Sequence, residues 1–228
     1  MRYSVVFLDL DNTILDFGMA EKKAITKLLE NNNVSADNDT VKLYSEINDG
    51  YWKSFERGEI KKEEIFSGRF KSFTAALNLN LDPEKLSKEY FGLLSFGNDV
   101  IDGAKDFLSF LKSKNVTVCI TTNGVAATQY KRIEGSGLKQ YFDYVFVSEA
   151  AGSQKPEKAY FDYVFKNIPP VDKSEILVIG DSESSDIAGG INSGLDTCLF
   201  DPESRVVKTK AKYTVHSLSE INKYIEGI

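Results

Sequence analysis

The sequence contains a single histidine, His216, in the segment YTVHSLSE near its carboxyl end. A Ser-His-Asp or Cys-His mechanism would have to pass every proton through that one residue, and a site with three histidine metal ligands is impossible. Hydrolases and zinc enzymes of these types are therefore disfavoured. We interpret His216 as a surface residue near the start of a terminal helix.

Cysteines and long apolar runs are also scarce. Cys119 and Cys198 are the only cysteines, and both lie in strand-like apolar stretches, where an unpaired cysteine usually behaves as a small hydrophobe. No apolar run approaches the roughly 18 residues that a membrane helix needs, and Met1 and Arg2 lead directly into a strand pattern without a signal-peptide core. We therefore expect a cytoplasmic protein without disulfides that does not bind membranes.

The chain has no excess of positive charge. Its formal net charge is −6 and its pI is about 5.0. Binding to a nucleic-acid polymer depends mainly on clustered lysine and arginine, so that class of partner is not expected. A small phosphorylated metabolite needs only a local positive site and stays open as a ligand. The 228 residues, 42% of them hydrophobic, are enough for one domain or for one domain with an insertion.

Two kinds of periodicity divide the chain. Between Ala20 and Ser95, apolar residues recur at helical spacing in three successive stretches, and Pro83 opens a fourth, as proline does at the first position of a helix. After Phe96, short apolar strands alternate with amphipathic helices, a pattern that predicts a parallel sheet covered on both faces. The expected strands are Val116–Thr121, Tyr144–Val147, Glu175–Ile179 and Asp196–Phe200, and among the expected helices one starts at Pro156 and one lies around Ser185–Asn192.

The opening strand, Tyr3–Leu8, has no parallel partner close to it in the sequence, so we assign it to the later sheet. The expected fold class is α/β: a Rossmann-like parallel sheet core formed by residues 1–15 and 97–228, with an inserted all-helical domain formed by residues 16–96. Ligands of open parallel sheets bind outside the carboxyl ends of the strands. The loops that follow the strands should therefore hold the chemistry.

The first of these loops follows VVFL and contains Asp9 and Asp11. Two carboxylates at this spacing point the same way from a strand end, and their mutual repulsion tends to separate their pKa values. Such a pair suits a nucleophile or metal ligand beside a general acid and base. The alternative is a solvated turn in an acidic protein.

Three further loops contain polar residues of complementary kinds. Thr122 and Asn123 in ITTNG suit phosphate or oxyanion contacts, and Lys155 in GSQKPEKAYF can neutralise negative charge. Asp181 and Asp186 in ILVIGDSESSDIAGG suit a hard cation such as Mg²⁺. Each loop taken alone also fits an ordinary helix cap or glycine turn.

Taken in order, the segments DLDNT, TTNG, QKP and GDSESSD resemble the four motifs of the haloacid dehalogenase superfamily of phosphohydrolases. The resemblance implies that the protein hydrolyses phosphomonoesters in a Mg²⁺-dependent reaction through an aspartyl-phosphate intermediate. Asp9 would attack phosphorus. Asp11 would protonate the leaving oxygen and then activate water. Superfamily members that cleave carbon–halogen bonds lack the second acid, so Asp11 favours phosphate chemistry.

The same resemblance implies roles for the other loops. Thr122 and the Asn123 amide would bind phosphoryl oxygens, and Lys155 would offset the negative charge. Mg²⁺ would lie between Asp9, the backbone carbonyl of Asp11 and Asp181, with Asp186 just outside the direct ligands.

The helical insertion resembles the first-type cap of this superfamily, which closes over the site and contacts the leaving group. Its segment NDGYWKSFERGEIKKEEIFSGRF resembles the cap of pyrimidine-type 5′-nucleotidases, which act on noncanonical nucleoside monophosphates. Phe17 or Trp52 could stack on a base, and Arg57 or Arg69 could contact its polar groups. The alternative is that the aromatic residues fill the core of the cap itself.

Several alternative functions remain open at this point. A sugar-phosphate phosphatase or a phosphomutase of the same superfamily would share every core residue, and transfer of phosphoryl label between sugar positions would separate a mutase from a hydrolase. A phosphorylation switch of the receiver-domain type uses similar groups in a chain about half as long, without a segment like GDSESSD. An inactive binding protein would show no metal-dependent turnover of p-nitrophenyl phosphate. A monomer or a homodimer is expected.

Overall fold

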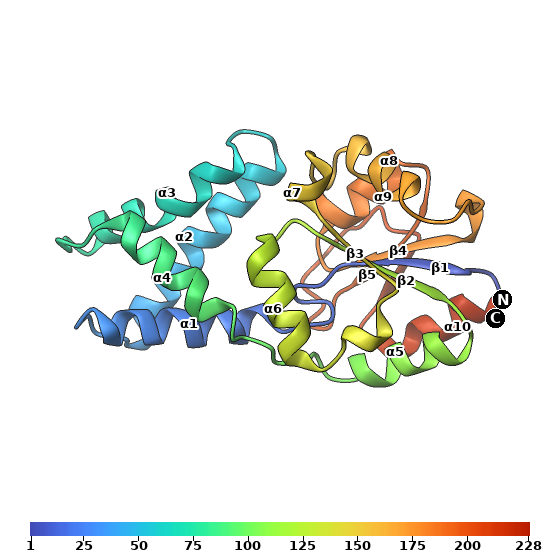
Figure 1. The fold of residues 1–228 in the computed structure, drawn as a ribbon, viewed down its shortest axis with the longest axis horizontal. Helices are drawn as coiled ribbons and strands as arrows, with labels where there is room; N and C mark the ends of the chain where they lie inside the picture. Colours follow the sequence, from blue (N-terminus) through green and yellow to red (C-terminus); the bar gives the residue numbers. More distant parts are fainter. The chain divides into compact units, whose positions relative to one another are not determined.

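The computed structural model describes residues 1–228, which divide into two compact units. Residues 1–16 and 100–228 form the unit that contains the sheet, and Phe17–Asp99 form a helical unit inserted after the first strand. Figure 1 shows the helical unit in blue to green and most of the sheet unit in green to red. The helical unit thus begins and ends slightly further along the chain than the expected boundaries at residues 16 and 96.

Six parallel strands form one sheet in the order β3-β2-β1-β4-β5-β6, which confirms the expected α/β class. Their bounds are β1 Val5–Leu8, β2 Thr117–Thr122, β3 Tyr144–Val147, β4 Ile176–Gly180, β5 Asp196–Phe200 and β6 Tyr213–Val215. The opening strand is central, because Val5 pairs with both Thr117 of β2 and Ile176 of β4. The apolar pattern did not predict β6, an edge strand in which Val215 is the only buried residue.

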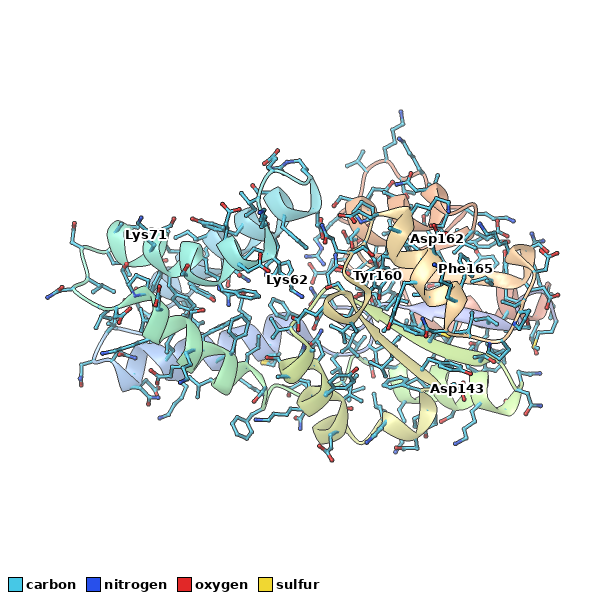
Figure 2. The ribbon with its side chains drawn as sticks, turned by 45° about the horizontal axis from the view of Figure 1, so that its top comes forward. Lys62, Lys71, Asp143, Tyr160, Asp162 and Phe165 are labelled. Carbon is cyan, nitrogen blue, oxygen red and sulfur yellow. The ribbon has the colours of Figure 1, made fainter.

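Alternation along β1 directs its side chains to two different apolar layers. Val6 and Leu8 pack in one cluster with residues of α5 (Ala104–Ser113), α6 (Ala126–Ser136) and α10 (Ile221–Glu226). Val5 and Phe7 pack on the other face with α8 (Lys158–Lys166). Both faces of the sheet are therefore covered, as continuous apolar strands require. Figure 2 labels Tyr160 and Phe165 on α8; Tyr160 is buried in this second cluster, and Phe165 packs against it.

The remaining segments of the sheet unit are short. They are α7 (Ser148–Ala151), α9 (Ala188–Asn192), 3₁₀ turns at Lys139–Tyr141, Lys173–Glu175 and Leu218–Glu220, and a π-helical turn at Glu183–Ile187. The helix expected to start at Pro156 starts instead at Lys158. The single helix expected near residues 185–192 is the π-helical turn followed by α9. π-Helical turns are frequent at functional sites.

The helical unit consists of four helices with a core of their own. They are α1 (Phe17–Asn31), α2 (Asn38–Glu56), α3 (Lys62–Ala76) and α4 (Pro83–Leu94). Asp37 caps α2 by accepting a hydrogen bond from the Thr40 backbone N–H at 2.8 Å, which satisfies a donor that the first turn would leave open. Residues from all four helices form the core: Ala20, Ala24, Leu28, Tyr44, Phe70, Phe73 and Tyr90.

Both cysteines are unpaired and buried in the sheet. Burial raises the pKa of each thiol to about 12, so neither is a reactive thiolate at neutral pH. Among the helices, none combines the length and the apolar character that spanning a membrane would require.

Candidate active site

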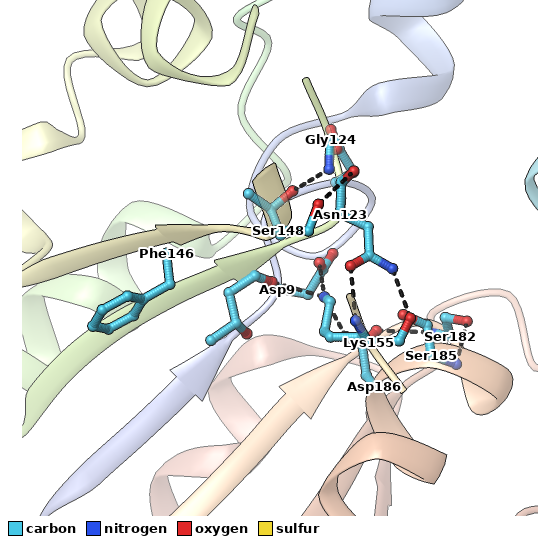
Figure 3. A network of polar contacts seen from close by, with 12 residues as sticks. Asp9, Asn123, Gly124, Phe146, Ser148, Lys155, Ser182, Ser185 and Asp186 are labelled. Carbon is cyan, nitrogen blue, oxygen red and sulfur yellow. Dashed lines mark hydrogen bonds and ion pairs between the residues drawn. The ribbon is translucent and has the colours of Figure 1, made fainter. Parts of the chain in front are cut away.

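The loops after β1, β2, β3 and β4 meet at one edge of the sheet, and the ammonium group of Lys155 lies where they meet (Figure 3). Lys155 Nζ donates to Asp9 Oδ1 at 2.5 Å, to the Thr121 carbonyl at 2.7 Å and to Asp186 Oδ1 at 2.6 Å. These three bonds use all three N–H groups of the ammonium. Lys155 is 1% exposed, so its charge is fully enclosed.

Two opposing effects act on the pKa of Lys155. Burial alone would lower it, but the negative charges of Asp186 and Asp9 outweigh burial and raise it above its ordinary value. Lys155 is therefore a permanent cation at physiological pH. It serves as an electrostatic group and hydrogen-bond donor, and it cannot act as a base.

Asn123 fixes the backbone that carries Lys155. Its Nδ2 donates to the Lys155 carbonyl and its Oδ1 accepts from the Lys155 N–H, both at 2.9 Å. This reciprocal pair joins the loop after β2 to the loop after β3 (Figure 3). The Asn123 side chain thus has a structural partner in the Lys155 backbone.

Asp186 reaches Lys155 because Gly180, at the end of β4, has no side chain. A Cβ atom at Gly180 would lie 2.2 Å from Oδ2 and from Cγ of Asp186. Asp186 is 1% exposed, and its Oδ2 accepts a hydrogen bond from the Ser182 N–H at 3.1 Å. The glycine of the sequence GDSESSD is therefore needed for the second aspartate to fold back over the strand end.

Asp9, Asp181 and Asp186 form a carboxylate cluster in which one oxygen of each lies within 4.8 Å of the others. Burial raises the pKa of Asp9 well above its ordinary value; Lys155 opposes this shift and Asp186 and Asp181 add to it. The pKa of Asp181 is raised to about 7, first by burial and then by Asp186. Three carboxylates thus face one ammonium.

This donor set fits Mg²⁺. The cation prefers carboxylate oxygens and takes few of them from the protein. Burial, and then the neighbouring carboxylates, raise the pKa values of Asp9 and Asp181, and a divalent ion would supply positive charge that favours their ionised forms. Asp186 uses one oxygen for Lys155 and the other for a backbone N–H, which makes it the least available of the three.

The raised pKa of Asp181 gives a stability prediction. The pKa of this carboxyl in the unfolded chain is close to 3.9, so the folded protein binds the proton more tightly than the unfolded chain does. The stabilisation that comes from this proton is complete below about pH 4 and is lost as the pH rises through about 7. In EDTA at pH 8, Asp181→Asn should therefore be more stable than wild type by ~2 kcal/mol. The difference should vanish at pH 4, as measured by urea unfolding.

Two controls accompany this measurement. Asp162→Asn makes the same chemical change at an exposed position of α8 and should change stability by only a few tenths of a kcal/mol. Mg²⁺ should stabilise wild type more than Asp181→Asn. Equal stability of wild type and Asp181→Asn across the whole pH range would contradict the assignment of Asp181 to a crowded carboxylate cluster.

Asp11 is held by two residues that sequence reasoning did not identify. Gln129 Nε2 donates to Asp11 Oδ2 at 2.6 Å and to Thr122 Oγ1 at 2.9 Å, and Arg132 Nη1 forms an ion pair with Asp11 Oδ1. Both residues lie on α6, directly after the segment TTNG. Their spacing of three residues was a usable signal, because it places both on one helix face. Their burial could not be read from residue type.

The four expected substrate contacts, Phe17, Trp52, Arg57 and Arg69, belong to the helical unit. Trp52 is half-buried and packs edge-on against Phe55. Arg57 pairs with Glu59 at the end of α2. Arg69 is 1% exposed, stacks near the Tyr90 ring and donates to Asn48 Oδ1 at 2.7 Å.

Arg69 is therefore part of the core of the helical unit. Aromatic faces lie near its guanidinium, and the Asn48 amide oxygen accepts a hydrogen bond from its Nη1.

A family model for haloacid dehalogenase-like hydrolases matches residues 3–194. The HAD-hydrolase YfnB of Bacillus subtilis is 40% identical over 96% of this chain and 94% of its own length. Two enzymes named pyrimidine 5′-nucleotidase are also similar. PynA of Streptococcus pneumoniae is 33% identical over 97% of this chain and 94% of its own length, and YjjG of Escherichia coli is 31% identical over 99% of both.

A solved structure of YfnB is similar over the whole chain. It superposes with a TM-score of 0.93 at 39% identity and covers 99% of both chains. That crystal form is described as bound to magnesium, with movement between its domains. The sheet, the inserted helices and the order of the loops thus have a counterpart in an experimental structure.

Proposed function

This chain belongs to the haloacid dehalogenase-like hydrolases and is a phosphatase of that superfamily, and from this premise we propose that it hydrolyses nucleoside 5′-monophosphates with a pyrimidine base. The observation that carries the proposal is the meeting of Asp9, Lys155 and Asp186 at one sheet edge, beside Asp11 and Thr122. Lys155, the Thr122 hydroxyl and a cation held by the carboxylates would together offer positive charge and hydrogen-bond donors to an anionic phosphoryl group.

In the first step, Asp9 attacks phosphorus. Its Oδ1 is held by Lys155, which leaves Oδ2 as the attacking oxygen. A new P–O bond forms to Asp9 while the bond to the leaving oxygen breaks, and Asp11 gives that oxygen a proton. Thr122 and the main chain of Asn123 bind the phosphoryl oxygens, and Lys155 lowers the repulsion between the aspartate and the phosphate dianion.

In the second step, water attacks the phosphorus of phosphorylated Asp9. Asp11, now ionised, takes a proton from this water, and the bond between phosphorus and Asp9 breaks so that its electron pair returns to the carboxylate. Mg²⁺, held by Asp9, Asp181 and the Asp11 carbonyl, would neutralise negative charge on the phosphoryl group in both steps. Asp186 keeps Lys155 in place through the bond at 2.6 Å.

A first assay tests the reaction class. Hydrolysis of p-nitrophenyl phosphate should require Mg²⁺ and stop when the ion is removed with EDTA. Absence of turnover with and without the metal would favour the inactive binding protein. Recovery of the phosphoryl group on a second sugar position, instead of as inorganic phosphate, would favour the phosphomutase.

We expect the nucleobase to determine which substrates are hydrolysed with the highest kcat/KM. We expect UMP, dUMP or dTMP to be hydrolysed with a kcat/KM about 10-fold higher than purine nucleotides or hexose phosphates. The support is the resemblance of the helical unit to pyrimidine nucleotidase caps and the similarity to PynA and YjjG. A panel of nucleotides and sugar phosphates under one set of conditions measures it, and a clear preference for sugar phosphates would identify a sugar-phosphate phosphatase instead.

We assign base stacking to Trp52, with Phe17 as the second candidate for this contact. Trp52→Leu should raise KM for UMP by ~10-fold, since stacking on a base contributes about 1–3 kcal/mol, and should leave p-nitrophenyl phosphate turnover nearly unchanged. Phe96→Leu, an exposed aromatic residue of the same unit, is the matched control. An equal loss with both substrates would assign Trp52 to the packing of α2.

A further inference from the structure

Two buried polar residues on α6 surround the side chain of Asp11. Gln129 is 2% exposed and Arg132 is 0% exposed. A fully buried arginine is uncommon, because removing its charge from water costs free energy unless a partner compensates. The partner here is the carboxylate of Asp11, which is paired with Arg132 at one oxygen and accepts from Gln129 at the other.

The two α6 residues are also joined to each other. Arg132 Nη1 lies 3.1 Å from Gln129 Oε1, so the guanidinium orients the amide while the amide nitrogen points to Asp11 and Thr122. This direction of the amide is the one that gives every contact a donor and an acceptor. Gln129, Arg132 and Asp11 thus form a closed polar triangle.

The loop after β2 is shaped to let Gln129 reach Asp11. A Cβ atom at Gly124 would lie 2.3 Å from Gln129 Nε2 and 2.5 Å from its Cδ, so the glutamine side chain occupies the space that any other residue at position 124 would need. The carboxylate at the end of this path stays accessible: the Asp11 side chain is 27% exposed, whereas the Arg132 side chain is 1% exposed. Each carboxylate oxygen thus accepts from a donor on α6, while the side chain keeps contact with solvent.

We propose that Gln129 and Arg132 are positioning residues that hold Asp11 in the orientation in which it takes a proton from the attacking water. The inference rests on the proposed function, in which Asp11 serves both steps. Two donors on one carboxylate, one at each oxygen, restrict the rotation of the Asp11 side chain. A misplacement of about 1 Å in a reacting group can cost ~100-fold in rate, so the loss of one donor should be measurable.

Rapid mixing with p-nitrophenyl phosphate separates the two steps. Its leaving phenolate needs little protonation, so phosphorylation of Asp9 should be unaffected in Gln129→Leu, and the burst of nitrophenolate should keep its rate. Hydrolysis of the phosphoenzyme should be ~10-fold slower. The burst amplitude should therefore rise toward one equivalent per enzyme, and the steady-state rate should fall. Arg132→Lys, which keeps the charge but shortens the reach, should act in the same direction. Gln140→Leu, at an exposed glutamine, is the matched control.

A double variant tests whether the effect passes through Asp11. In an Asp11→Asn background, adding Gln129→Leu should cause no further loss in the rate of phosphoenzyme hydrolysis. A further loss, or an equal slowing of burst and steady state in Gln129→Leu alone, would overturn the proposal, because Gln129 would then act through Thr122 or through the fold. Thermal melting of each variant identifies a folding defect. If Gln129→Leu has such a defect, the burst and steady-state rates of Arg132→Lys test the proposal instead.

Failure of the proposed function would look different. Wild type would then release no nitrophenolate in the presence of Mg²⁺, and acid quenching would trap no phosphoenzyme. A wild-type enzyme that forms and hydrolyses the phosphoenzyme, together with a Gln129→Leu variant that is unchanged in both steps, would refute the positioning role alone.

Discussion

Asp9→Asn is expected to lower kcat with p-nitrophenyl phosphate by ~10⁴-fold or more, since the loss of a covalent nucleophile is among the largest single effects in enzymes. The amide oxygen can still accept the hydrogen bond from Lys155, so the neighbouring loops should stay in place. The amide cannot form the acyl phosphate. Steady-state kinetics on protein whose mass confirms the asparagine measures the effect.

Stability should not fall with activity in this variant. The pKa of Asp9 is raised by burial, so its charge is unfavourable in the folded protein, and removing that charge should leave the melting temperature in EDTA unchanged or higher. Asp162→Asn, exposed on α8, should keep full activity. Turnover of Asp9→Asn near the wild-type level would exclude the covalent mechanism.

Lys155→Met should combine the second-largest loss of activity with the largest loss of stability. Methionine fills a similar volume but leaves Asp9 and Asp186 buried without the cation that both contact. Removing one partner of a buried ion pair typically costs 3–5 kcal/mol, so we expect a loss of about 4 kcal/mol in EDTA at pH 8, measured by urea unfolding. Turnover should fall by at least ~10³-fold, because Lys155 offsets the charge of the phosphate.

The stability loss in Lys155→Met should depend on pH. Lys155 is the charge that opposes the upward shift of the Asp9 pKa, so without it that pKa rises further and the folded variant takes up a proton that the unfolded chain does not hold. Such stabilisation is present at low pH and lost as the pH rises, so the deficit relative to wild type should shrink from pH 8 to pH 5. Lys158→Met, an exposed lysine of α8, is the control. A deficit that is constant with pH would mean that lost packing is the cause.

The main features of the fold follow from patterns in the sequence. Continuous apolar runs require burial on both faces, and this was enough to predict the parallel sheet and to assign Tyr3–Leu8 to it. The same reasoning missed β6, because Tyr213 and Thr214 retain contact with solvent and give no apolar run. Helix starts at Pro156 and Ser185 were also misplaced. α8 begins at Lys158, where Glu157 makes no capping hydrogen bond, and the π-helical turn begins at Glu183 after Ser182, whose side chain accepts from the Ser185 N–H.

The candidate site could be outlined from the sequence because strand ends are visible there. Asp9 and Thr122 each stand at the end of an apolar run, and parallel strands bring such positions together. Gln129 and Arg132 could not be found in this way. Nothing in their residue types distinguishes a solvated helix face from one that is buried against a carboxylate, and the same ambiguity allowed Arg69 to be considered as a substrate contact. Whether such a side chain is buried or exposed depends on its contacts with residues that lie far away in the sequence.

The central place of β1 in the sheet has a consequence for biosynthesis. Asp9 is made before the strands that flank it, because β1 pairs with strands that begin at Thr117 and Ile176. The helical unit, Phe17–Asp99, is contiguous and has its own core, so it can fold on the ribosome while the first strand waits without a partner. Asp9 gains its lysine and its neighbouring carboxylates only after most of the chain has emerged. A nascent chain therefore carries no complete site until Asp181 and Asp186 have been made.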